Sequence, residues 1–265
     1  MTATIRNNVK VSGRGTRPIL FAHGFGCDQN MWRFIAPDFE DDYKVVLFDH
    51  VGAGHSALAA FDRTKYRTLE GYAQDVLEIC KELDLTDVTF VGHSVSSMIG
   101  VVAAVQQPER FSNLVLVGPS PRYINDGEYK GGFERQEIDG LLEMLDANYL
   151  GWASTMAPAI MGNADRPELA NELHSSFCRT DPQIAKFFAR VTFLSDNRSD
   201  LKKVQARTLV LQCSNDMIAP LPVGEFVHRE IPGSTLLILR ATGHCPNLSA
   251  PAETSAAIRK FLERG

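Results

Sequence analysis

The residues with the clearest capacity for chemistry stand in one short segment, GHSVS at residues 92–96. An apolar run at 88–91 precedes this segment and a helical apolar pattern follows it, which predicts a strand, a sharp turn and a helix. Small residues two positions before and after the serine, here Gly92 and Ser96, permit so tight a turn. The turn would expose the Ser94 hydroxyl as a nucleophile. A plain strand–helix turn with a capping serine is the alternative.

A serine nucleophile needs a base and an acid, and candidates for both lie downstream of Ser94. Residues 207–213 have the pattern of a strand, and Asp216 follows that strand; residues 234–240 have the same pattern, and His244 follows them. The carboxyl ends of parallel strands meet at one edge of a sheet, where open α/β proteins build their sites. Serine, acid and histidine also occur in the order that α/β hydrolases require. We therefore predict Ser94, Asp216 and His244 as a catalytic triad, with turn and loop scaffolding as the alternative roles of Asp216 and His244 taken singly.

A glycine-rich loop near the start of the chain provides the fourth part of this predicted site. The buried-looking strand 18–22 leads directly into HGFG at residues 23–26. In such enzymes this loop donates one backbone N–H to the developing oxyanion, and the residue after the nucleophile donates the other. The predicted donors are the backbone N–H groups of Phe25 and Val95. A simple glycine-rich turn is the alternative.

Length, composition and charge fit one α/β domain with an insertion. The chain has 265 residues, of which 44% are hydrophobic and 22% charged, as in ordinary globular proteins. A net charge of −5 argues against nucleic acid as a main partner, because phosphate binding needs a concentrated basic surface. No apolar segment is long enough to span a membrane, and the N-terminus lacks the apolar core of a secretion signal.

The cysteines and the acidic and histidine side chains outside the triad predict neither a disulfide framework nor a metal site. Five scattered cysteines without a CxxC motif favour a reducing compartment, so we expect a cytoplasmic protein. Cys245 is either a reactive thiol or, as we favour, a packing residue. We interpret Asp49, His50 and His55 as loop scaffolding, because no further ligand has suitable spacing. No cofactor is predicted.

Alternating strand and helix patterns predict an α/β fold with a mostly parallel sheet and helices on both faces. The expected elements are strands at Ile5–Val11, 18–22, 43–48, 88–91 and 114–117, and helices at 69–83 and after Ser94. From residue 119 to residue 201 the pattern becomes helical throughout. We therefore predict a hydrolase core at 1–118 and 202–265, with a helical lid at 119–201. Candidate pocket residues on the lid, each of which is alternatively plain helix packing, are Phe133, Trp152, Met156, Phe177 and Phe193.

Several motifs together resemble those of the RsbQ-like α/β hydrolases, bacterial stress-response regulators related to the plant karrikin and strigolactone receptors. The resemblance spans nearly the whole chain, and its specific part lies in the lid. Its motifs are HGFGCDQ at 23–29, the 49–56 loop, GHSVS at 92–96, PSPRY at 119–123, GGFE at 131–134, FCRTDP at 177–182 and GHCP at 243–246.

The resemblance implies a V-shaped cap of four helices above an apolar cavity and the triad and oxyanion residues already named. It also implies a signalling role with a PAS-domain phosphatase that activates an alternative sigma factor, in response to a small hydrophobic ester or lactone. Two positions depart from the RsbQ-like pattern. Ser96 replaces an expected glycine, as in the plant receptors, and His50 replaces an expected aromatic residue. A metabolic carboxylesterase or lactonase without a signalling partner is the alternative function.

Overall fold

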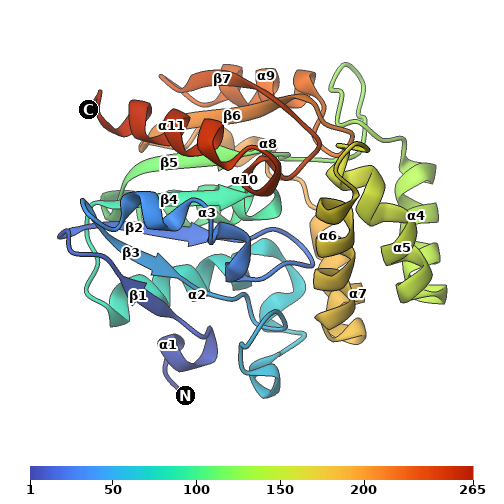
Figure 1. Cartoon of the computed structure of the whole chain (residues 1–265), viewed down its shortest axis with the longest axis horizontal. Coiled ribbons are helices and arrows are strands. Elements are labelled where there is room, and N and C mark those ends of the chain that lie inside the picture. The colour runs from blue at the N-terminus through green and yellow to red at the C-terminus, as the bar shows by residue number, and fades with distance from the viewer. Residues whose placement is uncertain (265) are drawn as a thin grey trace.

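One sheet organises the molecule, and its strand order is β1-β3-β2-β4-β5-β6-β7 (Figure 1). The computed structural model of the chain describes residues 1–264. Strand β1 pairs antiparallel with β3, and the other neighbouring strands pair in parallel. The strands are β1 Lys10–Ser12, β2 Arg17–Ala22, β3 Tyr43–Leu47, β4 Val88–His93, β5 Phe111–Val117, β6 Arg207–Asn215 and β7 Thr235–Thr242.

Helices cover both faces of the sheet because alternate strand residues point to opposite sides. In β2, Leu20 packs into the apolar cluster formed with helices α2 (Leu69–Glu82) and α3 (Val95–Gln106). Its neighbours Ile19 and Phe21 join the cluster on the other face, which includes helix α11 (Pro251–Leu262). The central strands of the sheet are therefore buried on both faces, and the loops at their carboxyl ends are where a site can be built.

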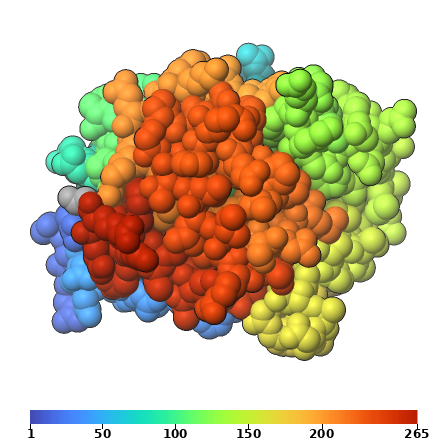
Figure 2. Space-filling model, turned by 90° about the horizontal axis from the view of Figure 1, so that it is seen from above, coloured from blue at the N-terminus to red at the C-terminus, as the bar shows by residue number. Residues whose placement is uncertain are grey.

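Four helices between β5 and β6 form a separate layer, which we call the lid. They share one apolar cluster and gather at one end of the molecule in Figure 1; Figure 2 shows their green and yellow residues beside the orange and red C-terminal part. The lid helices are α4 Arg135–Ala147, α5 Tyr149–Met161, α6 Pro167–Arg179 and α7 Pro182–Phe193. They lie within the segment predicted as a lid, whereas α8 (Arg198–Leu201), near the end of that segment, packs against α3 and α9 (Leu221–Glu230) of the core.

The remaining elements are short. They are the helices α1 Ala3–Arg6 and α10 Pro246–Ser249 and the 3₁₀ turns η1 Gln29–Trp32, η2 Ala36–Phe39, η3 Leu58–Ala60, η4 Lys65–Arg67 and η5 Pro108–Arg110.

The fold confirms the predicted α/β class, but the strand predicted at Ile5–Val11 is wrong. A helical turn, α1, occupies the first part of this segment, and only the edge strand β1 follows it. Thr2 caps the turn by accepting the N–H of Ile5, and Arg6 forms an ion pair with the buried Asp75 on α2. Asn8, with φ of 46°, then takes a left-handed conformation between this turn and β1. Capping and a long-range ion pair therefore override the local apolar pattern.

Candidate active site

The loops that follow β4, β6 and β7 bring Ser94, Asp216 and His244 into one hydrogen-bonded line. His244 Nε2 lies 2.7 Å from Ser94 Oγ, and His244 Nδ1 lies 2.7 Å from Asp216 Oδ2. The other carboxylate oxygen, Asp216 Oδ1, accepts the backbone N–H groups of Ile218 and Ala219 at 2.8 and 3.1 Å. Because the carboxylate accepts the Nδ1 proton, Nε2 is left to accept the proton of the serine hydroxyl. This is the geometry of a charge-stabilised general base beside a nucleophile.

The turn that carries Ser94 is strained, as the sequence pattern predicts. Ser94 has φ of 57° and ψ of −125°, and its N–H donates to the carbonyl oxygen of Val117 at 2.8 Å. A Cβ at Gly92 would lie 2.5 Å from the carbonyl oxygen of Ser96, so only glycine fits beside the first turn of α3. A non-glycine residue holds such a conformation only where its surroundings fix it. Here the fixed turn projects the Ser94 side chain away from the sheet.

The loop after β2 lies directly against this turn. A Cβ at Gly24 would lie 2.8 Å from His93 Nδ1 and 3.2 Å from Ser94 Cβ, so the backbone approaches the serine as closely as it can. Within residues 1–264, the backbone N–H groups of Phe25 and Val95 donate to no protein acceptor. Two unused donors on either side of a nucleophile could bind an oxyanion.

A small cavity of about 30 Å³ lies above Ser94, under the lid. Two of the five predicted pocket residues, Phe177 and Phe193, line it, and so does the Phe25 side chain. The other three, Phe133, Trp152 and Met156, belong to the surrounding apolar cluster but do not line the cavity. The complete lining is Phe25, Cys27, His93, Ser94, Tyr123, Ile160, Leu173, Phe177, Thr192, Phe193, Ile218, His244 and Cys245.

Ring packing explains why Trp152 stands behind the cavity wall. Its ring centroid lies 5.3 Å from that of Phe177, 6.0 Å from that of Phe25 and 6.3 Å from that of Tyr149. Only 1% of the residue is exposed. The indole therefore supports the aromatic side chains that line the cavity and forms a second layer. Helical spacing predicts which face of a lid helix is buried, but it does not predict which side chain of that face lines the cavity.

Several lining residues are not among those that the sequence pattern predicts. Tyr123 and Ile218 lie on the loops after β5 and β6, and Thr192 lies on α7. Their position after core strands or on a predicted lid helix is the signal that could have found them, and Tyr123 also lies in the PSPRY motif. Cys245 lines the cavity as well, and burial raises the pKa of its thiol well above the ordinary value. A buried neutral thiol suits the packing role, since reactive cysteines need an accessible thiolate.

Both backbone polar groups of His244 are held by partners outside its own loop. Its N–H donates to the carbonyl oxygen of Ile160 in lid helix α5 at 2.9 Å, and its carbonyl oxygen accepts from His93 Nε2 at 2.7 Å. Burial lowers the pKa of His93 to about 3, so this ring is neutral and donates from Nε2. Asn163, which follows α5, also donates to the carbonyl oxygen of Thr242 at 2.9 Å. The loop of the candidate base is thus bonded to the lid and to the residue beside the nucleophile.

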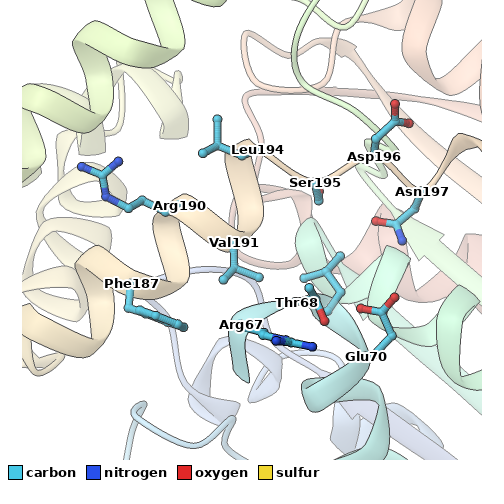
Figure 3. Close-up of a pocket in the computed structure, with 11 residues that line it drawn as sticks. Arg67, Thr68, Glu70, Phe187, Arg190, Val191, Leu194, Ser195, Asp196 and Asn197 are labelled. Carbon is cyan, nitrogen blue, oxygen red and sulfur yellow. The ribbon is translucent and has the colours of Figure 1, made fainter. Parts of the chain in front are cut away.

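A second and wider groove lies between lid helix α7 and the start of α2 (Figure 3). Arg67, Thr68 and Glu70 form one side of it, and side chains of α7, among them Phe187 and Val191, form the other. The groove is open to solvent and contains none of the three residues at the candidate active site. The cavity over Ser94, which Ser94 and His244 line, is therefore the one that can support the chemistry.

Comparison with known proteins agrees with this geometry. The sequence pattern of the family described as alpha/beta hydrolase fold matches residues 17–206. The chain belongs to the α/β-hydrolase family. It is 41% identical to strigolactone esterase D14 of Arabidopsis thaliana, over 97% of this chain and 96% of that protein. It is 40% identical to karrikin insensitive 2 receptor CA of Petunia hybrida, over 92% of this chain and 91% of that one.

Among solved structures, a hydrolase from Oleispira antarctica superposes on this α/β hydrolase with a TM-score of 0.96. That protein is 42% identical, and the match covers 99% of this chain and 97% of the other. An esterase from Exiguobacterium antarcticum shares the fold at 21% identity with a TM-score of 0.90. These likenesses make the chain a hydrolase and confirm the predicted relation to the karrikin and strigolactone receptors.

The scaffolding interpretation of the loop after β3 agrees with the contacts of Asp49. Its Oδ1 accepts the N–H of Gln29, and its Oδ2 accepts from Asn8 Nδ2 and from the N–H of His55. Within residues 1–264 there is no group of three or more histidine, cysteine or acidic side chains that could hold a metal ion. In the same part of the α/β hydrolase, no helix combines the length and the apolar character needed to cross a bilayer.

Proposed function

We propose that this α/β hydrolase cleaves a small hydrophobic ester or lactone by a serine mechanism. Ser94 is the nucleophile, His244 the general base and Asp216 the residue that holds the imidazole, while Phe25 and Val95 donate to the oxyanion. The observation that carries the proposal is the unbroken line of two 2.7 Å hydrogen bonds from Asp216 through His244 to Ser94, beneath a cavity under the lid.

The proposed reaction has two stages. Ser94 Oγ attacks the carbonyl carbon as its proton passes to His244 Nε2, and the carbonyl oxygen becomes an oxyanion. The intermediate then collapses, the bond to the leaving alcohol breaks, and that alcohol takes the proton from His244. In the second stage a water molecule attacks the acyl-serine in the same way, which releases the acid and restores the Ser94 hydroxyl. For a lactone, acid and alcohol are parts of one product.

The cavity favours small neutral substrates. Apart from Ser94, His244 and His93, the lining of the cavity consists of apolar, cysteine, threonine and tyrosine side chains, with no lysine, arginine or acidic residue among them. A charged substrate group would lie there without a partner, which is costly in an enclosed apolar site. Acetyl or butenolide esters should therefore react, and dicarboxylate or phosphorylated esters should not.

We further propose that hydrolysis serves signalling. The support is the 41% identity, over nearly the whole chain, to a protein named as a strigolactone esterase, and the 40% identity to one named as a karrikin receptor. With the RsbQ-like motifs, these relations favour a slow hydrolase that senses a small ligand and acts on a signalling partner, such as a PAS-domain phosphatase that controls a sigma factor. The five free cysteines suit a reducing, cytoplasmic setting for this role.

Metabolic esterase activity without a partner is the second candidate. It is favoured by the 42% identity and close superposition with a structure described only as a hydrolase. Both functions need the same triad, so the triad does not distinguish them. They differ in the rate of substrate turnover and in whether an acyl group remains bound to the protein after the reaction.

Steady-state turnover of p-nitrophenyl acetate and of a synthetic butenolide, with mass spectrometry of the protein after reaction, separates the candidates. A metabolic enzyme turns over many times and retains no adduct; a sensor reacts slowly and retains an acyl group. In either case Ser94→Ala should lower kcat by at least about 10³-fold and leave the circular dichroism spectrum unchanged. Residual activity within about tenfold of wild type, or some 1.4 kcal/mol, would rule out Ser94 as the nucleophile.

A further inference from the structure

Ser96 on α3 and His50 in the loop after β3 make a buried contact outside the triad. Neither residue is exposed to solvent. His50 Nε2 lies 2.7 Å from Ser96 Oγ, and Ser96 Oγ lies 2.5 Å from the carbonyl oxygen of His23. These are the two positions at which the sequence departs from the RsbQ-like pattern. In the structure, the two departures are partners of each other.

The direction of every hydrogen bond in this group follows from its backbone groups, because a carbonyl oxygen can only accept and an N–H can only donate. The carbonyl oxygen of His23 can only accept, so the Ser96 hydroxyl donates to it and in turn accepts from His50 Nε2. The backbone N–H of His50 donates to His23 Nε2 at 3.1 Å. His23 therefore carries its proton on Nδ1, which donates to the carbonyl oxygen of Gly24 at 2.8 Å. Burial lowers the pKa of both rings, which agrees with two neutral imidazoles.

This group links the two halves of the proposed oxyanion hole. The Val95 donor is in the first turn of α3, next to Ser96. The Phe25 donor lies two residues after His23, whose carbonyl oxygen Ser96 binds. Both donors have to lie about 2.7–3.1 Å from the oxyanion, so their separation must be held constant. The Ser96 hydroxyl supplies a direct bond between the helix of one donor and the loop of the other.

We propose that Ser96 and His50 are positioning residues that set the separation of the two oxyanion donors. Ser96 makes the bond across the hole, and His50 orients the hydroxyl so that its hydrogen points at His23. The inference rests on the proposed hydrolase function and adds two residues that do not touch the substrate. It explains why a serine and a histidine are buried together where an apolar pair would fill the space.

Replacement of Ser96 tests the bond directly. Loss of a whole oxyanion donor costs about 10²- to 10³-fold in kcat, and a misplaced donor should cost less. For Ser96→Ala we expect kcat for p-nitrophenyl acetate to fall about 10- to 100-fold, with KM within about twofold of wild type. His50→Phe keeps the serine but frees its hydroxyl to rotate, so its kcat should fall by a smaller factor. His50→Gln keeps an N–H donor and should restore part of the loss.

The double variant His50→Phe/Ser96→Ala separates positioning from plain stability. Ser96→Ala alone leaves the His50 donor buried without an acceptor, so its Tm should fall. Removing both polar groups cancels that penalty, and the Tm of the double variant should recover toward wild type. Its kcat should stay low, because the bond to His23 is still absent. Recovery of kcat together with Tm would show that the pair only packs, and would overturn the inference.

Ser255→Ala is the matched control. Ser255 is also buried and also makes a 2.5 Å bond, to Asp38, but it lies on α11, whose apolar side chains belong to a different cluster from the one around the cavity. It should change Tm without changing kcat. An equal loss of kcat in Ser255→Ala and Ser96→Ala would overturn the inference. If wild type is active and Ser94→Ala is inactive, normal activity of the Ser96 and His50 variants overturns only the positioning inference. If wild type itself hydrolyses no ester, the proposed hydrolase function is overturned together with the inference.

Discussion

Buried neutral histidines should make the stability of this protein sensitive to acid. Burial lowers the pKa of His93 from 6.5 to about 3, whereas in the unfolded chain the ring regains its ordinary value. As the pH falls through 6.5, the unfolded state binds a proton that the folded state rejects. The free energy of unfolding therefore decreases from that point, and the decrease continues until the pH reaches about 3.

The size of the effect follows from this shift. Between about pH 7.5 and pH 5, the proton taken up by the unfolded His93 lowers the free energy of unfolding by about 2 kcal/mol. Below pH 5.5 the slope for one such ring approaches about 1.4 kcal/mol per pH unit. Burial also lowers the pKa of His23 and His50, so these rings act in the same direction.

Urea unfolding at a series of pH values measures this slope, with the fluorescence of the buried Trp32 and Trp152 as the signal. His93→Gln keeps a side-chain N–H for the His244 carbonyl but cannot titrate. Between about pH 6 and pH 4, the free energy of unfolding of this variant should fall less steeply with decreasing pH than that of wild type. The difference in slope should correspond to nearly one bound proton. Carboxylates titrate in both proteins and cancel in the difference. Parallel plots of the free energy of unfolding against pH for wild type and variant would refute the reasoning. His50→Gln repeats the test at a second buried histidine.

Three further tests address other parts of the structure. Asp216→Asn should lower kcat by about 10³- to 10⁴-fold with the fold intact, and full activity would show that another residue holds the base. Gly243→Ala should lower both Tm and kcat, because a Cβ there would lie 1.8 Å from a carbonyl oxygen of α5 and φ is +79°; Gly127→Ala, with φ of +59° and nothing within 4 Å, is the control for backbone strain alone. In a catalytically dead background, calorimetry should find that Phe177→Ala weakens ligand binding by about 1–3 kcal/mol. Trp152→Ala should weaken it less, and the reverse order would place the indole in the binding surface.

Much of the site could be predicted because its parts follow directly from single strands. Ser94, Asp216 and His244 each stand where an apolar run ends, and parallel strands bring such positions to one edge of the sheet. Local pattern and chain order are enough to find residues of this kind. The structure places all three within one hydrogen-bonded line.

The cavity wall and the supporting contacts could not be predicted in the same way. Whether Phe177 or Trp152 reaches the void depends on how the lid helices cross, which the period of a single helix does not contain. The contact of His50 with Ser96 joins positions 46 residues apart and leaves no local signal in the sequence. At the N-terminus, the apolar pattern of a few residues could not distinguish a strand from a capped helical turn.

The bond between the backbone N–H of His244 and the carbonyl oxygen of Ile160 couples the loop of the proposed base to lid helix α5. It is one of the two hydrogen bonds that fix the backbone of His244. A substitution in α5 that shifts Ile160 would therefore disturb the proposed proton acceptor without touching the cavity. The lid helix and the proposed catalytic machinery are thus parts of one hydrogen-bonded unit, and a change in one is transmitted to the other.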